Sequence, residues 1–140
     1  MRVLAAGKHA VKHKQALGKR GEDLTASLLA RRGYIILERN YKAPRGEVDL
    51  IAVDGDTLAF IEVKTRSTGA FGEPQRAVQP AKRRRIIRGA LHYLGRRCDR
   101  VEGLKFRCDV AAVRLPDGAG RPEIELIKNA FSLEEPGLNV

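Results

Sequence analysis

Three charged side chains stand inside two apolar runs near the middle of the chain. Residues 47–53 and 58–66 have the composition of two β-strands joined by a turn that contains a glycine. Asp49 lies in the first strand, and Glu62 and Lys64 lie in the second. A charge inside an apolar strand is unfavourable unless it is paired or binds a metal ion. These three residues are therefore the first candidates for chemistry.

Either register of the predicted hairpin brings the three side chains together. In one register Asp49 lies directly opposite Glu62, and Glu47 lies opposite Lys64, with Cβ atoms about 4.5–5.5 Å apart. If the turn forms one residue earlier, Asp49 and Glu62 become diagonal neighbours on the same face. Glu62 and Lys64 share that face because side chains alternate along a strand. Both registers predict two carboxylates and one ammonium group in one place.

This combination suits the hydrolysis of a phosphodiester bond. Two neighbouring carboxylates repel each other unless a cation lies between them, and oxygen ligands suit a hard ion such as Mg²⁺. A lysine beside the ion could stabilise the charge that develops on a phosphate, or orient a water molecule. The alternative is a surface hairpin with ordinary ion pairs, each worth under about 1 kcal/mol. The apolar neighbours argue against a fully solvated hairpin: Leu50, Ile51, Phe60, Ile61 and Val63.

Residues 46–52 (GEVDLIA) and 60–66 (FIEVKTR) resemble the two signature segments of the YraN-like family of bacterial proteins. That family is similar to the PD-(D/E)xK, or restriction-endonuclease-like, nucleases and to the archaeal-type Holliday junction resolvases. The resemblance implies that Asp49 and Glu62 are metal ligands and catalytic residues, that Lys64 is the catalytic lysine, and that the cofactor is Mg²⁺ or Mn²⁺. Glu22 resembles a glutamate that completes the site in the resolvase-like branch; alternatively, it is a helix-surface residue in an early turn.

The totals of the sequence fit a basic, globular protein. Its 140 residues form one domain, and its net charge of +10 with a pI near 10.1 favours an anionic polymer as partner. The alternative is that the charge serves solubility alone. There is no apolar run long enough to span a membrane, and two cysteines fit reduced thiols in the cytoplasm. The resemblance to resolvases also implies a homodimer.

A second concentration of charge lies on the helix predicted at residues 81–97. No acidic residue interrupts it before Asp99, and arginine makes bidentate bonds to phosphate oxygens. The preceding segment, 67–81, contains glycines and prolines and is either a substrate-contacting flap or disordered. We expect contacts with nucleic acid, most simply DNA, from these residues: Arg66, Lys82, Arg83, Arg84, Arg85 and Arg88.

The expected order of elements is that of an α/β protein. A helix at 15–32 ends at Gly33, and Asp109 in a later strand is expected to be structural. The fold predicted by the resemblance is a restriction-endonuclease-like core, with a mixed central sheet of about five strands flanked by helices. It spans residues 15–133, between a basic flexible tail at 1–14 and a loose tail at 134–140. Strands are expected at 34–41, 47–53, 58–66, 106–115 and 123–128.

The function expected from these observations is a metal-dependent nuclease that acts on nucleic-acid phosphodiester bonds, with branched DNA as one candidate substrate. Two alternatives stay open. One is a non-catalytic nucleic-acid-binding module with a nuclease-like fold. The other is a protein-interaction subunit.

Overall fold

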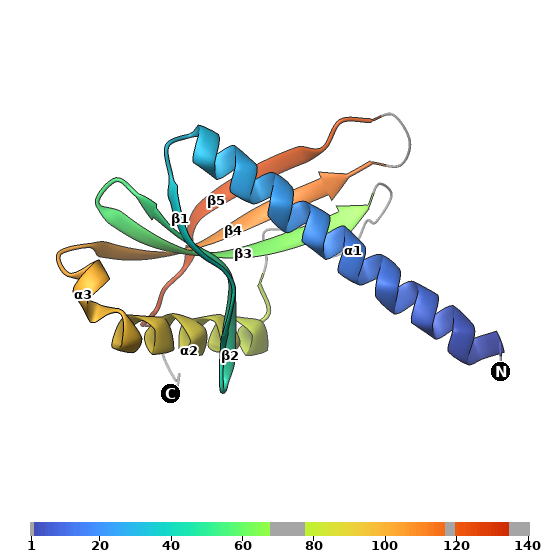
Figure 1. The fold of residues 1–140 in the computed structure, drawn as a ribbon, viewed down its shortest axis with the longest axis horizontal. Coiled ribbons are helices and arrows are strands. Elements are labelled where there is room, and N and C mark those ends of the chain that lie inside the picture. The colour runs from blue at the N-terminus through green and yellow to red at the C-terminus, as the bar shows by residue number, and fades with distance from the viewer. Residues whose placement is uncertain (1, 68–77, 117–119, 135–140) are drawn as a thin grey trace.

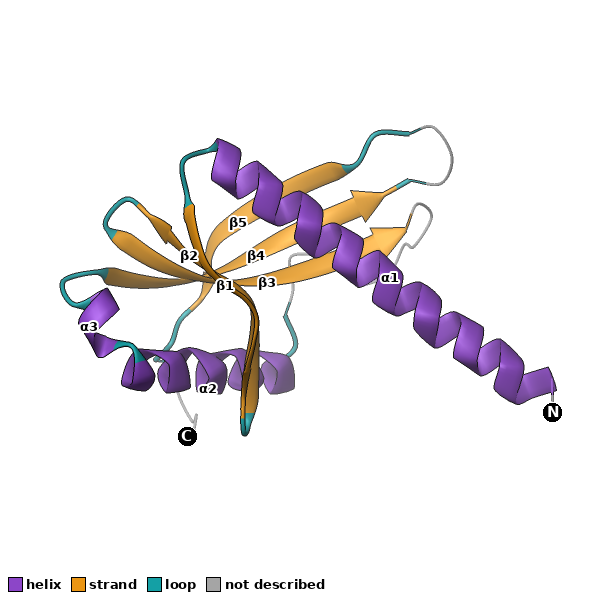
Figure 2. Ribbon diagram, in the orientation of Figure 1, coloured by secondary structure: helices purple, strands orange, loops and turns teal. Residues whose placement is uncertain are grey.

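A computed structural model of the chain describes residues 2–67, 78–116 and 120–134, apart from the side chains of residues 2–11, 98 and 100. The segment expected to form a flap falls largely at 68–77, and the expected C-terminal tail at 135–140, so both lie outside the described residues. Figure 2 shows the helices and strands in the order α1 (Arg2–Arg31), β1 (Ile35–Ala43), β2 (Gly46–Asp54), β3 (Thr57–Ser67), α2 (Pro80–Arg96), α3 (Cys98–Val101), β4 (Lys105–Leu115) and β5 (Glu123–Phe131).

The strands form one mixed sheet in the order β1-β2-β3-β4-β5. Strands β3 and β4 are parallel, whereas the other neighbouring pairs are antiparallel. A parallel pair needs a crossover connection, and α2 with the short α3 supplies it between β3 and β4. This confirms the predicted α/β fold, with the five-stranded mixed sheet and flanking helices of a restriction-endonuclease-like core.

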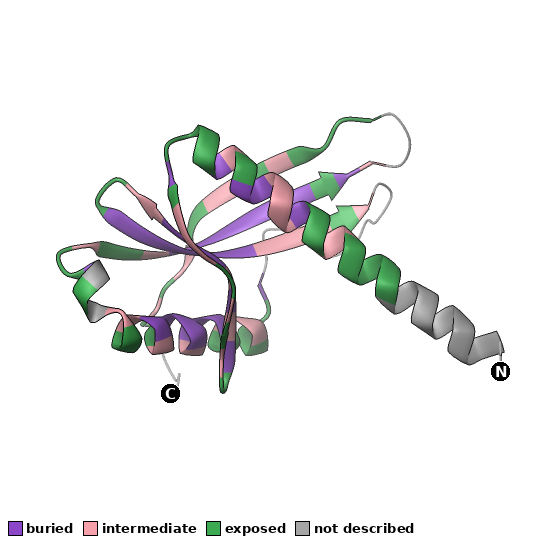
Figure 3. Cartoon of the chain, in the orientation of Figure 1, coloured by how far each residue is buried: buried purple, intermediate pink, exposed green. Residues whose placement is uncertain are grey.

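The two long helices lie on opposite faces of the sheet (Figure 1). Helix α1 packs mainly on β3 and β4, and helix α2 packs mainly on β2 and β1. The core under α1 contains Leu29 and Ile61, and the core under α2 contains Phe60 and Tyr93. Strand β3 is therefore covered on both sides, and residues 58–61 are fully buried, as Figure 3 shows for the middle of the sheet.

Helix α1 differs from the expectation at its start. It begins at Arg2 rather than Gln15, so the predicted flexible tail at residues 1–14 is helical from Arg2 onward. No proline interrupts residues 2–14, and Ala, Leu and Lys in that segment favour a helix. The helix ends as predicted, because Gly33 has a φ of 91°, the left-handed conformation in which glycine closes a helix.

The hairpin of β2 and β3 adopts the first of the two predicted registers. Its paired residues run from Leu50↔Ile61 to Asp54↔Thr57. The ladder ends there, so the expected direct pairs of Asp49 with Glu62 and of Glu47 with Lys64 are not part of it. Beyond the ladder, the Val63 backbone N–H donates a 2.8 Å hydrogen bond to the Asp49 carboxylate.

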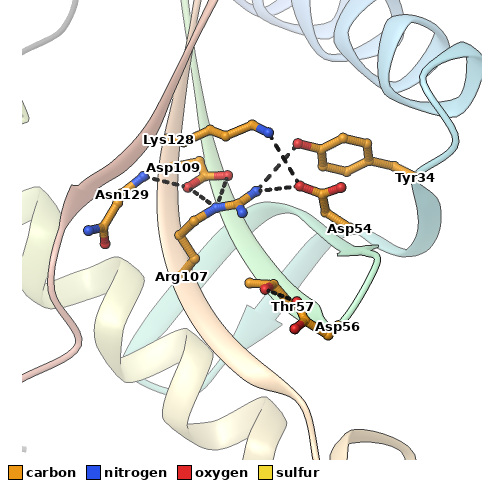
Figure 4. Close-up of polar contacts among 8 residues, drawn as sticks. All are labelled: Tyr34, Asp54, Asp56, Thr57, Arg107, Asp109, Lys128 and Asn129. Atoms are coloured by element: carbon orange, nitrogen blue, oxygen red, sulfur yellow. Dashed lines mark hydrogen bonds and ion pairs between the residues drawn. The ribbon is translucent and has the colours of Figure 1, made fainter.

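At the turn end of this hairpin, a polar network joins strands β2, β4 and β5 with Tyr34, the residue before β1 (Figure 4). The fully buried Asp109 accepts bonds of 2.8 and 3.0 Å from Arg107 and one of 2.8 Å from the Asn129 backbone N–H. Arg107 also bonds Asp54 at 3.1 Å and the Tyr34 hydroxyl at 3.3 Å. Every carboxylate oxygen of Asp109 thus has a donor, which fits the structural role expected for it.

We predict that Arg107→Met will lower the free energy of unfolding by about 3 kcal/mol, because it leaves the buried Asp109 carboxylate without its cation. Urea unfolding measures the change. The matched control is Arg114→Met, which removes an exposed arginine from the same strand and should change stability by less than about 0.5 kcal/mol. Equal effects of the two substitutions would contradict the structural role of the network.

Candidate functional site

Asp49 and Glu62 lie together at the end of the β2–β3 ladder. The Asp49 Oδ2 atom is held by the Val63 N–H, two residues beyond the last paired residue of β3. The Glu62 side chain is only 6% exposed, and its Oε2 atom has no hydrogen-bond partner among the described residues. Lys82 Nζ lies 3.5 Å from that Oε2, which is too long for a good N–H···O bond. A buried carboxylate oxygen therefore remains unsatisfied.

The electrostatics of the pair follow from burial and proximity. The pKa of Glu62 is raised from its ordinary 4.5 to about 9, first by burial and then by the hydrogen bond and charge of Asp49. Lys82 acts in the opposite sense but more weakly. Two carboxylates that share a buried place cannot both ionise without a compensating cation. The structure thus brings together the two predicted metal ligands in a place that favours added positive charge.

Glu22 reaches the same place from helix α1. A Cβ atom at Gly21 would lie 1.9 Å from Thr65 Oγ1, so only glycine allows the helix to approach β3 this closely. Burial raises the pKa of Glu22, the charge of Asp49 adds to the increase, and a hydrogen bond from Asn40 opposes it. Glu22 also lines a hollow of about 350 Å³ between α1 and β1.

Glu47 lies on the other side of the pair, among cations. Its Oε1 atom accepts a 2.9 Å bond from Lys82 and lies 3.2 Å from Arg85 Nη2, and its Oε2 atom accepts a 2.8 Å bond from Lys42. The hydrogen bonds of Lys42 and Lys82 lower the pKa of Glu47 to about 2. The expected partner, Lys64, is not among these contacts.

Helix α2 is held against Glu47 by a close contact between backbones. A Cβ atom at Gly46 would lie 2.4 Å from both Arg85 O and Gly89 N. Glycine at position 46 therefore lets the start of β2 rest directly on the helix. This contact places the first turns of α2, including Lys82, beside the carboxylates.

Lys64 is half-buried on β3, two residues after Glu62. The alternation of side chains along a strand places these two residues on the same face. Its Cα partner on the neighbouring strand is Ala112.

The six residues expected to bind nucleic acid divide into two groups. Arg66, Arg84 and Arg85 are exposed, and Arg88 is half-buried. Lys82 instead points to Glu47 and Glu62, and Arg83 bonds the Val78 carbonyl at 2.8 Å. Arg88 also lines a hollow of about 450 Å³ whose other walls are Ala43, Pro44, Arg45, Leu91 and His92.

The side chains fit a divalent cation held by a pair of carboxylates. Mg²⁺ commonly takes one or two carboxylates and keeps several water ligands, and the unsatisfied Oε2 atom of Glu62 is free to serve as a ligand. Among the residues that the structure describes, no three His, Cys, Asp or Glu side chains form a group that could hold a metal ion. Glu22 interacts electrostatically with Asp49, but it does not complete a three-ligand site in this arrangement.

Two features of the site were not foreseen from the sequence. Asn40 has a φ of 52° and contacts Glu22; the tolerance of asparagine for this conformation is a signal, but it does not identify the partner. Lys82 was expected to bind phosphate, and its contact with the carboxylates depends on how α2 packs. No signal in the sequence reports that packing.

The comparisons with known proteins place the chain among close relatives. The model of the family described as "Uncharacterised protein family UPF0102" matches residues 21–113. A UPF0102 protein of Geobacter sulfurreducens is 47% identical over 123 residues, covering 86% of this chain and 92% of the relative. A UPF0102 protein of Syntrophus aciditrophicus is 48% identical over 117 residues, covering 83% and 88%. One of Moorella thermoacetica is 47% identical over 114 residues, covering 81% and 93%.

Among the described residues, no helix is both long enough and apolar enough to cross a membrane.

We predict that Glu62→Gln will stabilise the metal-free protein at pH 8 by about 1–3 kcal/mol, the range for a buried unsatisfied group. The folded-state pKa of Glu62 is about 9, above its ordinary 4.5. The folded state therefore binds more protons than the unfolded state between these values, and this contribution to stability is lost as pH rises through that window. At pH 5 the variant and the wild type should differ much less.

Urea unfolding in EDTA at both pH values measures this effect. Glu102→Gln is the control, because Glu102 is exposed and lies far along the chain, after α3. If wild type and Glu62→Gln show parallel stability profiles between pH 5 and pH 8, the raised pKa of Glu62 is refuted.

Proposed function

We propose that this chain, which belongs to the uncharacterised protein family UPF0102, is a metal-dependent nuclease that cleaves phosphodiester bonds in nucleic acid. DNA is the expected substrate, and Mg²⁺ or Mn²⁺ the expected cofactor. The observation that carries the proposal is the buried Oε2 atom of Glu62, which has no hydrogen-bond partner among the described residues and lies beside a second carboxylate, that of Asp49.

An unsatisfied, buried carboxylate oxygen is rare in folded proteins and calls for a reason. Asp49 and Glu62 would hold the ion, which when bound would act as a Lewis acid on the phosphate and lower the pKa of a water molecule. Asp49 keeps its orientation through the Val63 N–H. Glu22, half-buried beside Asp49, would orient a water molecule from the side of the hollow under α1.

Lys64 supports the same chemistry from its position on β3. Its strand places it on the face of Glu62, so its ammonium group would stabilise the negative charge that develops on the phosphate oxygens. Preorganised charges of this kind act strongly in a place shielded from water. The half-buried position of Lys64 fits that requirement.

Exposed arginines on α2 provide a surface for the substrate backbone. Arg84 and Arg85 are exposed on the first turns of the helix, close to the carboxylates because Arg85 contacts Glu47. Arg66 lies at the end of β3 and Arg88 one turn further along α2. Their guanidinium groups suit bidentate contacts with phosphate oxygens, and the net charge of +10 would attract a polyanion.

The alternative is a non-catalytic nucleic-acid-binding module that keeps the fold and the basic helix. It shares the arginines with the proposed nuclease but makes no use of the unsatisfied Glu62. The discriminating observation is product formation. A protein that binds DNA equally with and without EDTA, and never cuts it, would be such a module.

We predict that Lys64→Ala will lower the rate of DNA cleavage by at least about 100-fold, as expected for the loss of a charge that stabilises a transition state. The affinity for DNA should change by less than about threefold, because the exposed arginines remain. Branched, duplex and single-stranded DNA, and RNA, should be incubated with Mg²⁺ or Mn²⁺, and binding measured in parallel by gel shift. Lys128→Ala, on β5, is the control for removal of a lysine elsewhere. Equal cleavage by wild type and Lys64→Ala would exclude the proposed mechanism.

We further predict that the double substitution Arg84→Ala and Arg85→Ala will weaken DNA binding and flatten its salt dependence. Each lost phosphate contact should reduce the slope of log K against log salt by about 0.9. The control is Arg31→Ala with Arg32→Ala, which removes two exposed arginines at the end of α1. Fluorescence anisotropy between 50 and 200 mM salt measures both slopes, and the same slope in both double variants would exclude this face of α2 as the binding surface.

A further inference from the structure

We propose that the Lys82 ammonium group occupies the position of the divalent cation beside Glu62 when no metal is bound. A metal ion that binds there moves the ammonium group away from Glu62 and leaves it bonded to Glu47. The inference rests on the proposed function only for the premise that the Asp49–Glu62 pair accepts such an ion. It assigns Lys82 a role in the site itself rather than on the surface that contacts nucleic acid.

The two contacts of Lys82 differ in quality. Its Nζ atom is 2.9 Å from Glu47 Oε1, a good hydrogen-bond distance, but 3.5 Å from Glu62 Oε2, beyond that range. This Oε2 is the atom that lacks a hydrogen-bond partner among the described residues. Lys82 therefore makes only a long, weak contact with Glu62, and moving away from Glu62 would leave its 2.9 Å bond to Glu47 in place.

Glu47 is suited to retain Lys82 after displacement. It is anchored by the contact of Gly46 with the α2 backbone and accepts bonds from cations on both of its oxygens. Because the Glu47 bond is already formed, the move requires only that the ammonium group leave the vicinity of Glu62. A small rotation of a long, half-exposed side chain, 36% accessible, is enough for this.

The position of Lys82 in the helix makes it easier for a metal ion to replace its ammonium group beside the carboxylates. It is the third residue of α2, and the first turn contains no acidic residue. The start of a helix carries partial positive charge, which disfavours a cation there. Lys82 is held in that place by carboxylates of other elements, and a doubly charged ion that binds the same carboxylates would compete with it directly.

Electrostatic repulsion links the two cations. A divalent ion bound to Glu62 Oε2 would lie within a few ångström of the present position of Nζ, and like charges at that distance repel strongly inside a protein. Occupation of Glu62 by the metal ion and by Lys82 is therefore mutually exclusive. Removal of Lys82 should strengthen metal binding.

The test is calorimetric titration of the full chain with Mn²⁺ at pH 8, without nucleic acid. We expect Lys82→Met to bind Mn²⁺ at least about fivefold more tightly than wild type, the lower end of typical coupling between sites. The matched control is Arg85→Met. It removes the same charge from the same helix turn and also contacts Glu47, at 3.2 Å, but no contact with Glu62 is found for it among the described residues.

The pattern across the variants decides the inference. Tighter Mn²⁺ binding by Lys82→Met, together with an unchanged Mn²⁺ affinity in Arg85→Met, supports the proposal. An equal gain in Mn²⁺ affinity in both variants would show a general effect of charge and overturn the proposal. No change in affinity in either variant, or no Mn²⁺ binding by any of the proteins, would also overturn it. Lys82→Gln, similar in length and polar, serves as the second variant if circular dichroism shows that Lys82→Met does not fold. Cleavage is a separate readout: a chain that binds Mn²⁺ in the expected pattern but cuts nothing refutes the nuclease and leaves the role of Lys82 intact.

Discussion

The structure depends on a conflict between burial and charge at the end of the β2–β3 ladder. Strand β3 is fully buried from Leu58 to Ile61, and the next residue is Glu62, whose carboxylate comes close to that of Asp49. Two acids in such a place oppose folding unless protons or cations compensate them. The protein uses one backbone N–H for Asp49 and a loosely placed ammonium group for Glu62. Residues that break the rules of a stable core while the rest of the fold obeys them are the expected mark of a functional site.

Two helices flank the Asp49–Glu62 pair from opposite faces of the sheet. Gly21 brings α1 against Thr65, and Gly46 brings the start of β2 against the backbone of α2. Neither contact leaves space for a Cβ atom: Gly21 packs against the Thr65 side chain, and Gly46 packs against the backbone of α2. These close approaches position Glu22 and Lys82 beside the carboxylates. Sites built on rigid elements are more accurately arranged than sites on loops. The carboxylates and the lysine therefore lie where the fold places them before any ligand arrives.

A comparison with Asp109 shows that a buried acid need not have an unsatisfied carboxylate oxygen. Asp109 is as buried as any residue of the core, but its oxygens receive donors from Arg107 and from the Asn129 backbone. That network includes residues near the turn end of the hairpin (Figure 4), and Asp109 itself is the Cα partner of Ile61, the residue before Glu62. The same sheet thus contains one satisfied acid that stabilises the fold and one unsatisfied acid that is available for chemistry.

The sequence by itself determined the strands and the end of the first helix, and it limited the hairpin to two registers. Alternation, a short turn and Gly33 are local signals, but the choice between the two registers was made only in the structure. The sequence also marked Asp49 and Glu62 as candidates for chemistry, because charge inside an apolar strand is visible without coordinates. Only the tertiary structure decided that Glu47 pairs with Lys42, Lys82 and Arg85. It also decided that Leu91, an apolar residue of α2, is 40% exposed. These outcomes depend on how a helix 35 residues away from Glu47 packs across the sheet, and contacts between distant segments are set by the shapes of both surfaces, which no local pattern contains.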